Sequence, residues 1–83
     1  METTALASER PALSVVLPMY NEEGNLAELF ARLRDTLDGM DLSGWELVFV
    51  DDGSRDGTFV ALSELAATDG RVRVLKFSRN FGH

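Results

Sequence analysis

Apolar residues in this chain form three short runs, and the two segments between them have helical spacing. The runs occupy residues 13–17, 45–50 and 72–77, and continuous apolar runs of this length are typical of buried β-strands. The intervening segments, about residues 22–38 and 58–68, carry apolar residues three and four positions apart, as in amphipathic helices. The pattern predicts strand–helix–strand–helix–strand, an α/β fold with a parallel sheet and right-handed crossovers. The expected spatial order of the strands is third, second, first.

Local signals set the expected boundaries of these elements. Residues 1–11 are small and polar and are expected to be a flexible leader, with residues 12–83 forming one domain. Pro18 is expected to end the first strand, because proline cannot donate a hydrogen bond to a sheet ladder. Asn21 is a good N-cap for the first helix. Gly39 is a typical residue for its C-terminal end.

The most informative stretch follows the second apolar run, where two carboxylates precede a glycine and a serine. Side chains alternate between the faces of a strand, so Asp51 and Asp52 should point in different directions. In open parallel sheets, ligands bind outside the carboxyl ends of the strands. This end of the sheet is expected to gather Tyr20, Asn21, Glu22, Asp51, Asp52 and Ser54, together with Arg79, Asn80 and His83. The alternative is that the acids and the serine only cap a turn and a helix.

Composition narrows the classes of function. The chain has 83 residues and a formal net charge of −6, which argues against general nucleic-acid binding. It has no cysteine, which excludes disulfides and Cys-based metal sites. No apolar run approaches the length of a transmembrane helix, and the first residues lack the apolar core of a signal peptide. Basic residues gather towards the end, at Arg71, Arg73, Lys76 and Arg79. They could face an anionic ligand or simply lie on a solvated strand edge.

The loop after the first strand indicates which part of a ligand could bind there. A dinucleotide site needs Gly-x-Gly-x-x-Gly, whereas residues 18–23 read Pro-Met-Tyr-Asn-Glu-Glu. Glutamates at the start of a helix would repel a phosphate. An aromatic ring can instead stack on a base, and carboxylates can accept hydrogen bonds from base N–H groups or ribose hydroxyls.

Three motifs together resemble the opening motifs of family 2 glycosyltransferases. They are residues 18–22 (PMYNE), residues 51–58 (DDGSRDGT) and residues 78–83 (SRNFGH). The most similar group is the polyprenyl-phosphate, or dolichol-phosphate, sugar transferases, and the resemblance covers about residues 13–83. It implies the front half of a GT-A fold, with a three-layer α/β/α architecture. It also implies that a nucleotide-diphosphate sugar, UDP- or GDP-linked, binds at the carboxyl ends of the strands.

The resemblance also implies roles for individual residues. Tyr20 and its neighbours would line the nucleotide pocket, and Asp52 would make the chief polar contact to the base. Asp51 and Ser54 would shape the turn, while Arg79 would lie near the diphosphate or organise a neighbouring loop. The full expected set of nucleotide-binding residues is Pro18, Tyr20, Asn21, Glu22, Val50, Asp51, Asp52, Ser54 and Arg79.

The sequence lacks one motif that the family uses for chemistry. Family members hold Mg²⁺ or Mn²⁺ on the diphosphate with an Asp-x-Asp motif, which is expected beyond His83 and does not occur in this chain. No metal site and no catalytic residue are therefore expected here, and the chain alone is expected to be inactive. Asp51 and Asp52 are a poor substitute, because adjacent strand residues diverge and hard cations need several convergent oxygens.

The resemblance further implies a whole enzyme at the cytoplasmic face of a membrane. It would transfer the sugar to a polyprenyl phosphate by direct displacement at the anomeric carbon, with inversion. The 83-residue chain would be its nucleotide-binding front. The first strand, residues 13–17, would then have a free edge through which two copies could pair.

Two other classes of function share parts of this pattern. A phospho-acceptor signalling domain needs acids after the first strand and an aspartate after the third, where this chain has Pro18 and Ser78-Arg79. A non-catalytic α/β binding or assembly module fits the short length and stays open as the alternative to an enzyme.

Overall fold

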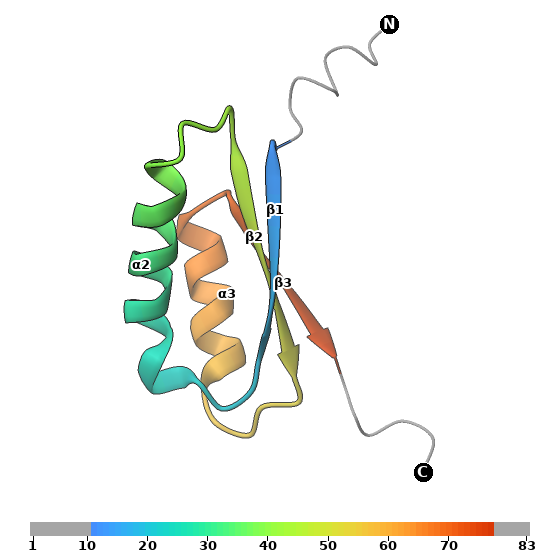
Figure 1. The fold of residues 1–83 in the computed structure, drawn as a ribbon. Helices are drawn as coiled ribbons and strands as arrows, with labels where there is room; N and C mark the ends of the chain where they lie inside the picture. Colours follow the sequence, from blue (N-terminus) through green and yellow to red (C-terminus); the bar gives the residue numbers. More distant parts are fainter. Residues whose placement is uncertain (1–10, 78–83) are drawn as a thin grey trace, which may run out of the picture.

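The fold is a three-stranded parallel sheet with two helices packed on one face (Figure 1). The computed structural model describes residues 11–77. Its elements in chain order are β1 (Leu13–Met19), the short 3-10 helix η1 (Glu23–Asn25), α2 (Leu26–Asp38), β2 (Trp45–Asp52), α3 (Thr58–Thr68) and β3 (Val72–Phe77). The spatial order is β1-β2-β3. The α/β class, the parallel pairing and the strand order are as the pattern predicts, and α3 and β3 begin and end at the predicted residues.

The core lies between the sheet and the two helices. Along β2 every second side chain is buried, beginning with Trp45 and continuing through Leu47, Phe49 and Asp51. This period of two follows from the pleat of a strand, which sends alternate side chains to opposite faces. The buried apolar residues are Met19, Leu26, Phe30, Leu37, Trp45, Leu47, Phe49, Leu62 and Val72.

On the opposite face of the sheet, several apolar side chains are open to solvent among the described residues. Val16 is 62% exposed, Leu75 is 55% exposed and Phe77 is 48% exposed. Pro18 and Val50 lie between them in register. Both helices cover the same face, so residues 11–77 form two layers of the expected three-layer architecture. Among these residues, no helix combines the length and apolar character that a membrane crossing needs.

Two predicted boundaries were wrong. Pro18 does not end β1, which continues to Met19 with Pro18 opposite Val50. Pro18 lies one residue before the end of β1, so its missing N–H costs the sheet at most one ladder bond at the end of the strand. β2 extends two residues further than predicted, to Asp52.

Asn21 is not an N-cap. It has a positive φ of 50°, and helical structure begins later, at η1, with Glu22 in the cap position and no side-chain cap bond. Asparagine tolerates this left-handed conformation better than most residues. Gly39 does follow the last residue of α2, but its φ of −81° is not left-handed. Predictions for residues 1–10 and 78–83 lie outside the described residues.

Candidate functional site

Two loops meet at the carboxyl ends of β1 and β2 and are joined by hydrogen bonds. The backbone N–H of Asn21 donates to Oγ of Ser54 at 2.9 Å. The side-chain Oδ1 of Asn21 accepts from the backbone N–H groups of Arg55 at 2.8 Å and Asp56 at 3.4 Å. We refer to residues 21–23 and 54–58, with the bonds between them, as the loop latch.

The buried side chain of Thr58 links both loops of the latch. Its side chain is fully buried, and its Oγ1 accepts from the backbone N–H of Glu22 at 2.8 Å. The hydroxyl donates to Oδ1 of Asp56, which also accepts from the Thr58 backbone N–H at 2.9 Å. The hydroxyl bond from Thr58 is the main cause that lowers the pKa of Asp56 below its ordinary value. Thr58 thus holds the start of α3 against the loop that follows β1.

Glu23 and Gly57 make the closest approach in the latch. Oε1 of Glu23 accepts from the Gly57 backbone N–H at 2.9 Å. The Glu23 backbone N–H donates to Oδ2 of Asp56 at 3.3 Å. A Cβ atom on Gly57 would lie 2.6 Å from Oε2 of Glu23, so the contact as it stands requires glycine.

Asp51 and Asp52 lie on opposite faces of the sheet, as the alternation along a strand predicts. Asp51 is fully buried on the helix side, in register with Met19 and Lys76. Neither of its carboxylate oxygens has a hydrogen-bond partner in the part of the chain that the structure describes. Asp52 is half-buried on the open side, in register with Phe77. Gly53 follows with a φ of 77°, a turn conformation that suits glycine.

The residues present do not fit a metal ion. Within residues 11–77, no group of three or more His, Cys, Asp or Glu side chains is placed to hold one. Asp51 and Asp52 diverge across the sheet and cannot offer convergent oxygens. No step of chemistry is therefore assigned to a metal in these residues.

Apart from the buried Asp51, the predicted site residues that the structure describes separate into two groups. The first lies at the open sheet face and its edge: Pro18 is exposed, Val50 is in register beside it, and Asp52 follows two residues later on the same face. Tyr20 comes just after β1 and is 48% exposed. This group can present an aromatic ring and a carboxylate to a ligand.

The second group builds the loops. Asn21 and Ser54 have partners within the latch, and Oε1 of Glu22 accepts from the Asn25 side chain at 3.2 Å. Arg79, with Asn80 and His83, lies outside the described residues.

The sequence alone does not predict the hydrogen-bond partners of four latch residues, Glu23, Asp56, Gly57 and Thr58. The triplet Asp56-Gly57-Thr58 was visible as helix-start chemistry. Glu23 was visible only as an acid in the first turn. Their contacts cross from residue 23 to residues 56 and 57, and no local pattern contains them.

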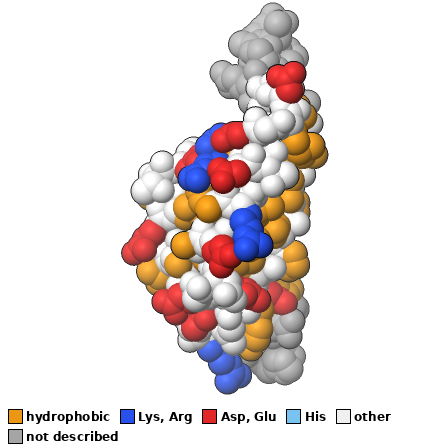
Figure 2. Space-filling view, turned by 60° about the vertical axis from the view of Figure 1, so that its left-hand side comes forward, with side chains coloured by type: hydrophobic (Ala, Val, Ile, Leu, Met, Phe, Trp, Pro, Cys, Tyr) orange, Lys and Arg blue, Asp and Glu red, His pale blue; other side chains and the backbone are white. Residues whose placement is uncertain are grey.

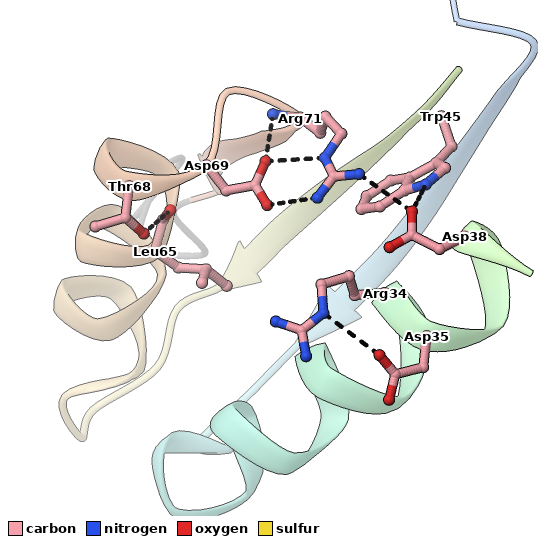
Figure 3. Close-up of polar contacts among 8 residues, drawn as sticks. All are labelled: Arg34, Asp35, Asp38, Trp45, Leu65, Thr68, Asp69 and Arg71. Carbon is pink, nitrogen blue, oxygen red and sulfur yellow. Dashed lines mark hydrogen bonds and ion pairs between the residues drawn. The ribbon is translucent and has the colours of Figure 1, made fainter. Parts of the chain in front are cut away.

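A second polar cluster lies at the other end of the sheet, where the strands begin (Figure 3). Nε and Nη2 of Arg71 donate to Asp69 at 3.1 and 3.0 Å, and Nη1 donates to Asp38 at 3.3 Å. Trp45 Nε1 donates to the same Asp38 oxygen at 2.9 Å. The Arg71 side-chain hydrogen bond is the largest cause that lowers the pKa of Asp69. We call Asp38, Trp45, Asp69 and Arg71 the basal cluster.

The basal cluster and its neighbours account for three of the four late basic residues. Arg71 is held at the end of the sheet opposite the candidate site. Arg73 faces Glu46 at 3.8 Å, and Lys76 lies 4.8 Å from the centre of the Phe59 ring. Arg71 therefore lies away from the candidate site, whereas Arg73, whose side chain is 68% exposed, fits the alternative of a solvated strand edge.

A groove of about 340 Å³ runs between α2 and α3 on the helix side. Leu26, Phe30 and Leu65 line it, and Glu23 and Glu64 bring carboxylates to it. Figure 2 shows acidic side chains distributed among apolar ones over this side of the molecule. A groove with these two carboxylates does not suit a diphosphate, so it is distinct from the candidate site.

Residues 14–83 match the sequence model of the family described as glycosyl transferase family 2. The uncharacterized glycosyltransferase YkcC of Bacillus subtilis (strain 168) is 44% identical over 70 residues, covering 84% of this chain and 21% of the relative. The undecaprenyl-phosphate 4-deoxy-4-formamido-L-arabinose transferase of Aeromonas hydrophila is 37% identical over 71 residues, covering 84% of this chain and 22% of the relative.

A solved structure has the same fold. The mannosyltransferase PcManGT from Pyrobaculum calidifontis, in complex with GDP-Man and Mn²⁺, superposes with a TM-score of 0.54 at 29% identity. The superposition covers 89% of this chain and 21% of that one. The chain thus spans about a fifth of the length of these relatives.

Proposed function

The chain belongs to glycosyl transferase family 2, and on that premise we propose that residues 12–83 bind the nucleotide of a nucleotide-diphosphate sugar. The whole enzyme would transfer the sugar from a UDP- or GDP-linked donor to a polyprenyl phosphate, reached at the cytoplasmic face of a membrane. Two relatives named as polyprenyl-phosphate enzymes support this acceptor, the Aeromonas arabinose transferase and a dodecaprenyl-phosphate galacturonate synthase of Rhizobium johnstonii. The GDP-Man and Mn²⁺ of the mannosyltransferase support a nucleotide-sugar donor and a divalent metal in the whole enzyme.

One observation carries the proposal. The loop latch fixes the segment after β1 against the segment after β2, and this holds Tyr20 and Asp52 at the same end of the sheet. The ring of Tyr20 is exposed and can stack on a base, while the Asp52 carboxylate can accept hydrogen bonds from base N–H groups. Pro18 and Val50 add an apolar floor beside them.

This chain would contribute binding and positioning, and no catalytic residue. A carboxylate that accepts hydrogen bonds from base N–H groups discriminates between bases. A base without a matching donor would leave the Asp52 carboxylate unpaired in the complex. The sequence contains no Asp-x-Asp triplet. We therefore propose that the 83-residue chain has no transferase turnover by itself, and that Mg²⁺ or Mn²⁺ acts only in the whole enzyme.

Calorimetric titration of the chain with UDP, GDP and ADP, with and without Mn²⁺, tests the binding proposal. We expect saturable binding of UDP or GDP, weaker binding of ADP, and no dependence on Mn²⁺. A Tyr20→Ala variant should weaken the response, and Val60→Ala, on the outer side of α3, is the matched control. Absence of heat with both UDP and GDP would reject nucleotide binding by this chain.

A further inference from the structure

Asn21 is bonded to the loop after β2 through both its main chain and its side chain. Its backbone N–H donates to Oγ of Ser54 at 2.9 Å, and its Oδ1 accepts from the backbone N–H of Arg55 at 2.8 Å. Its φ of 50° lies in the left-handed region, where most residues other than glycine are strained and asparagine is tolerated. The chain that leaves β1 therefore turns at Asn21, at a point that the other loop fixes.

The residue just before this turn is Tyr20, and strand register places it next to Asp52. The last pair of the β1–β2 ladder is Met19 with Asp51, and the next residues along the two chains are Tyr20 and Asp52. Met19 and Asp51 are buried on the helix side, so alternation puts the residues that follow them on the open side. Because Tyr20 is 48% exposed, packing restrains its ring only partly, and its placement depends on the backbone at the turn.

The backbone after the turn is fixed as well. The N–H of Glu22 donates to Oγ1 of Thr58 at 2.8 Å, and Thr58 is fully buried. A change of conformation at Asn21 therefore cannot be absorbed on that side. It would instead move Tyr20, which precedes the turn and is only half-covered by neighbours.

We propose that Asn21 is a positioning residue for nucleotide recognition, which fixes Tyr20 beside Asp52 so that one base can meet the ring and the carboxylate together. The nature of the ligand rests on the proposed function, whereas the placement of Tyr20 by Asn21 does not. Asn21 acts through Tyr20, since its own N–H and Oδ1 are already bonded within the protein.

NMR can follow this placement directly, because Tyr20 is the only tyrosine in the chain. Asn21→Ala removes the acceptor oxygen and strains the positive φ. It should move the Tyr20 ring signals towards those of an unstructured tyrosine. It should also weaken the binding of uridine or guanosine, whichever wild type binds, at least about fivefold, the lower end of the loss expected when a base loses its aromatic stacking partner.

Rescue by a conservative variant separates positioning from a contact with the ligand. Asn21→Asp keeps an acceptor oxygen and tolerates the same φ, but it has no amide group to donate. It should restore the ring signals of Tyr20 and bring the nucleoside affinity to within about twofold of wild type. Nucleosides are used because they carry no charge for the added carboxylate to repel.

Two further variants control for stability. Arg71→Lys is the matched control, because it weakens the basal cluster at the other end of the sheet. It should leave the Tyr20 ring signals and the nucleoside affinity unchanged. Ser54→Ala removes only the acceptor of the Asn21 N–H, and it should move the ring signals in the same direction even if Asn21→Ala does not fold.

The outcomes separate this inference from the proposed function. Ring signals that keep their wild-type positions in Asn21→Ala, or in Ser54→Ala where the first variant does not fold, would overturn the placement. Displaced signals with unchanged affinity, or a lack of rescue by Asn21→Asp, would overturn the positioning role. If wild type binds neither nucleosides nor UDP and GDP, the proposed function is rejected, and the ring signals of the free variants still decide whether Asn21 places Tyr20.

Discussion

The guanidinium of Arg71 lies 3.9 Å from the centre of the Trp45 ring, and the two side chains share Asp38 as a hydrogen-bond acceptor. This contact connects the start of β2 to the residue before β3, where the Arg71 carbonyl also accepts from the Leu47 N–H at 2.8 Å. Asp38 is the last residue of α2 and Asp69 directly follows α3, so their bonds to Arg71 connect the ends of both helices to the sheet. Four elements thus depend on a single arginine.

We expect Arg71→Lys to lower the free energy of unfolding by about 1–2 kcal/mol. Lysine keeps the charge but loses the planar stacking on Trp45 and the paired bonds to Asp69. Urea unfolding followed by Trp45 fluorescence measures the change. Arg32→Lys is the control, because Arg32 is 77% exposed in its pair with Glu28, and its loss should stay within about 0.5 kcal/mol. Equal effects of the two substitutions would contradict the role of the basal cluster.

Acid should weaken the basal cluster and the latch together. The pKa values of Asp69 and Asp56 are lowered from the ordinary value of 3.8, so their contribution to stability is present above about pH 3.8. It is lost as the pH falls through the lower folded-state values. Asp69→Asn should therefore be less stable than wild type at pH 7, with a difference that shrinks below pH 3.8. Urea midpoints across pH 2–7 measure this, and a pH-independent difference would contradict it.

Asp52→Ala should weaken nucleotide binding more than Asp51→Ala. Asp52 is on the open side, whereas Asp51 is fully buried on the helix side. Loss of a charged acceptor for a base N–H costs about 1.5–3 kcal/mol, which is roughly a ten- to hundredfold loss of affinity. Calorimetry on the two variants decides the order. A larger loss for Asp51→Ala would reverse the assignment of faces.

Asp51→Asn should stabilise the chain. A buried carboxylate with no hydrogen-bond partner carries a desolvation cost, and the amide keeps its shape without the charge. We expect a gain of about 1 kcal/mol or more in the free energy of unfolding, measured by urea denaturation at pH 7. Glu64→Gln, at an exposed carboxylate on α3, is the matched control and should change stability little. Destabilisation by Asp51→Asn would show that the carboxylate has a partner, such as a buried water.

Within residues 11–77, β1 has a neighbouring strand on one side only. We predict that its other edge and its open face promote self-association of this chain, through residues 13–17. Val16 is 62% exposed on that face, and exposed apolar edge strands pair with other chains. Val16→Lys should therefore reduce association, seen by light scattering over a concentration series. Val60→Lys, at a site on α3 that is 60% exposed, is the control and should not. A monomer at every concentration in wild type would reject this prediction.

The sequence predicted the parts of the fold that depend on local pattern. Helix α3 and strand β3 have the bounds that apolar spacing indicates, because burial of one helical stripe and one strand run needs no distant information. The role of Asn21 was mispredicted for the opposite reason. A local rule favours asparagine as an N-cap, but bonds to Ser54 and Arg55, more than thirty residues away, hold it in another conformation.

In the candidate site, too, the local features could be predicted and the long-range contacts could not. The divergence of Asp51 and Asp52 followed from the strand pleat alone. The Glu23–Gly57 and Arg71–Asp38 contacts did not, because each joins loops or helix ends that approach one another only after the sheet has formed.

The latch also sets the smallest unit that can be exchanged between relatives. Its acceptors Asn21 and Glu23 belong to one loop, and most of the amides they satisfy belong to the other. A chimera that replaces only residues 18–25, or only residues 53–58, separates these partners, and it leaves amides or carboxylates unmatched wherever the grafted loop has other residues at positions 21, 23 or 57. Loop grafting between relatives should therefore exchange residues 18–25 and 53–58 together.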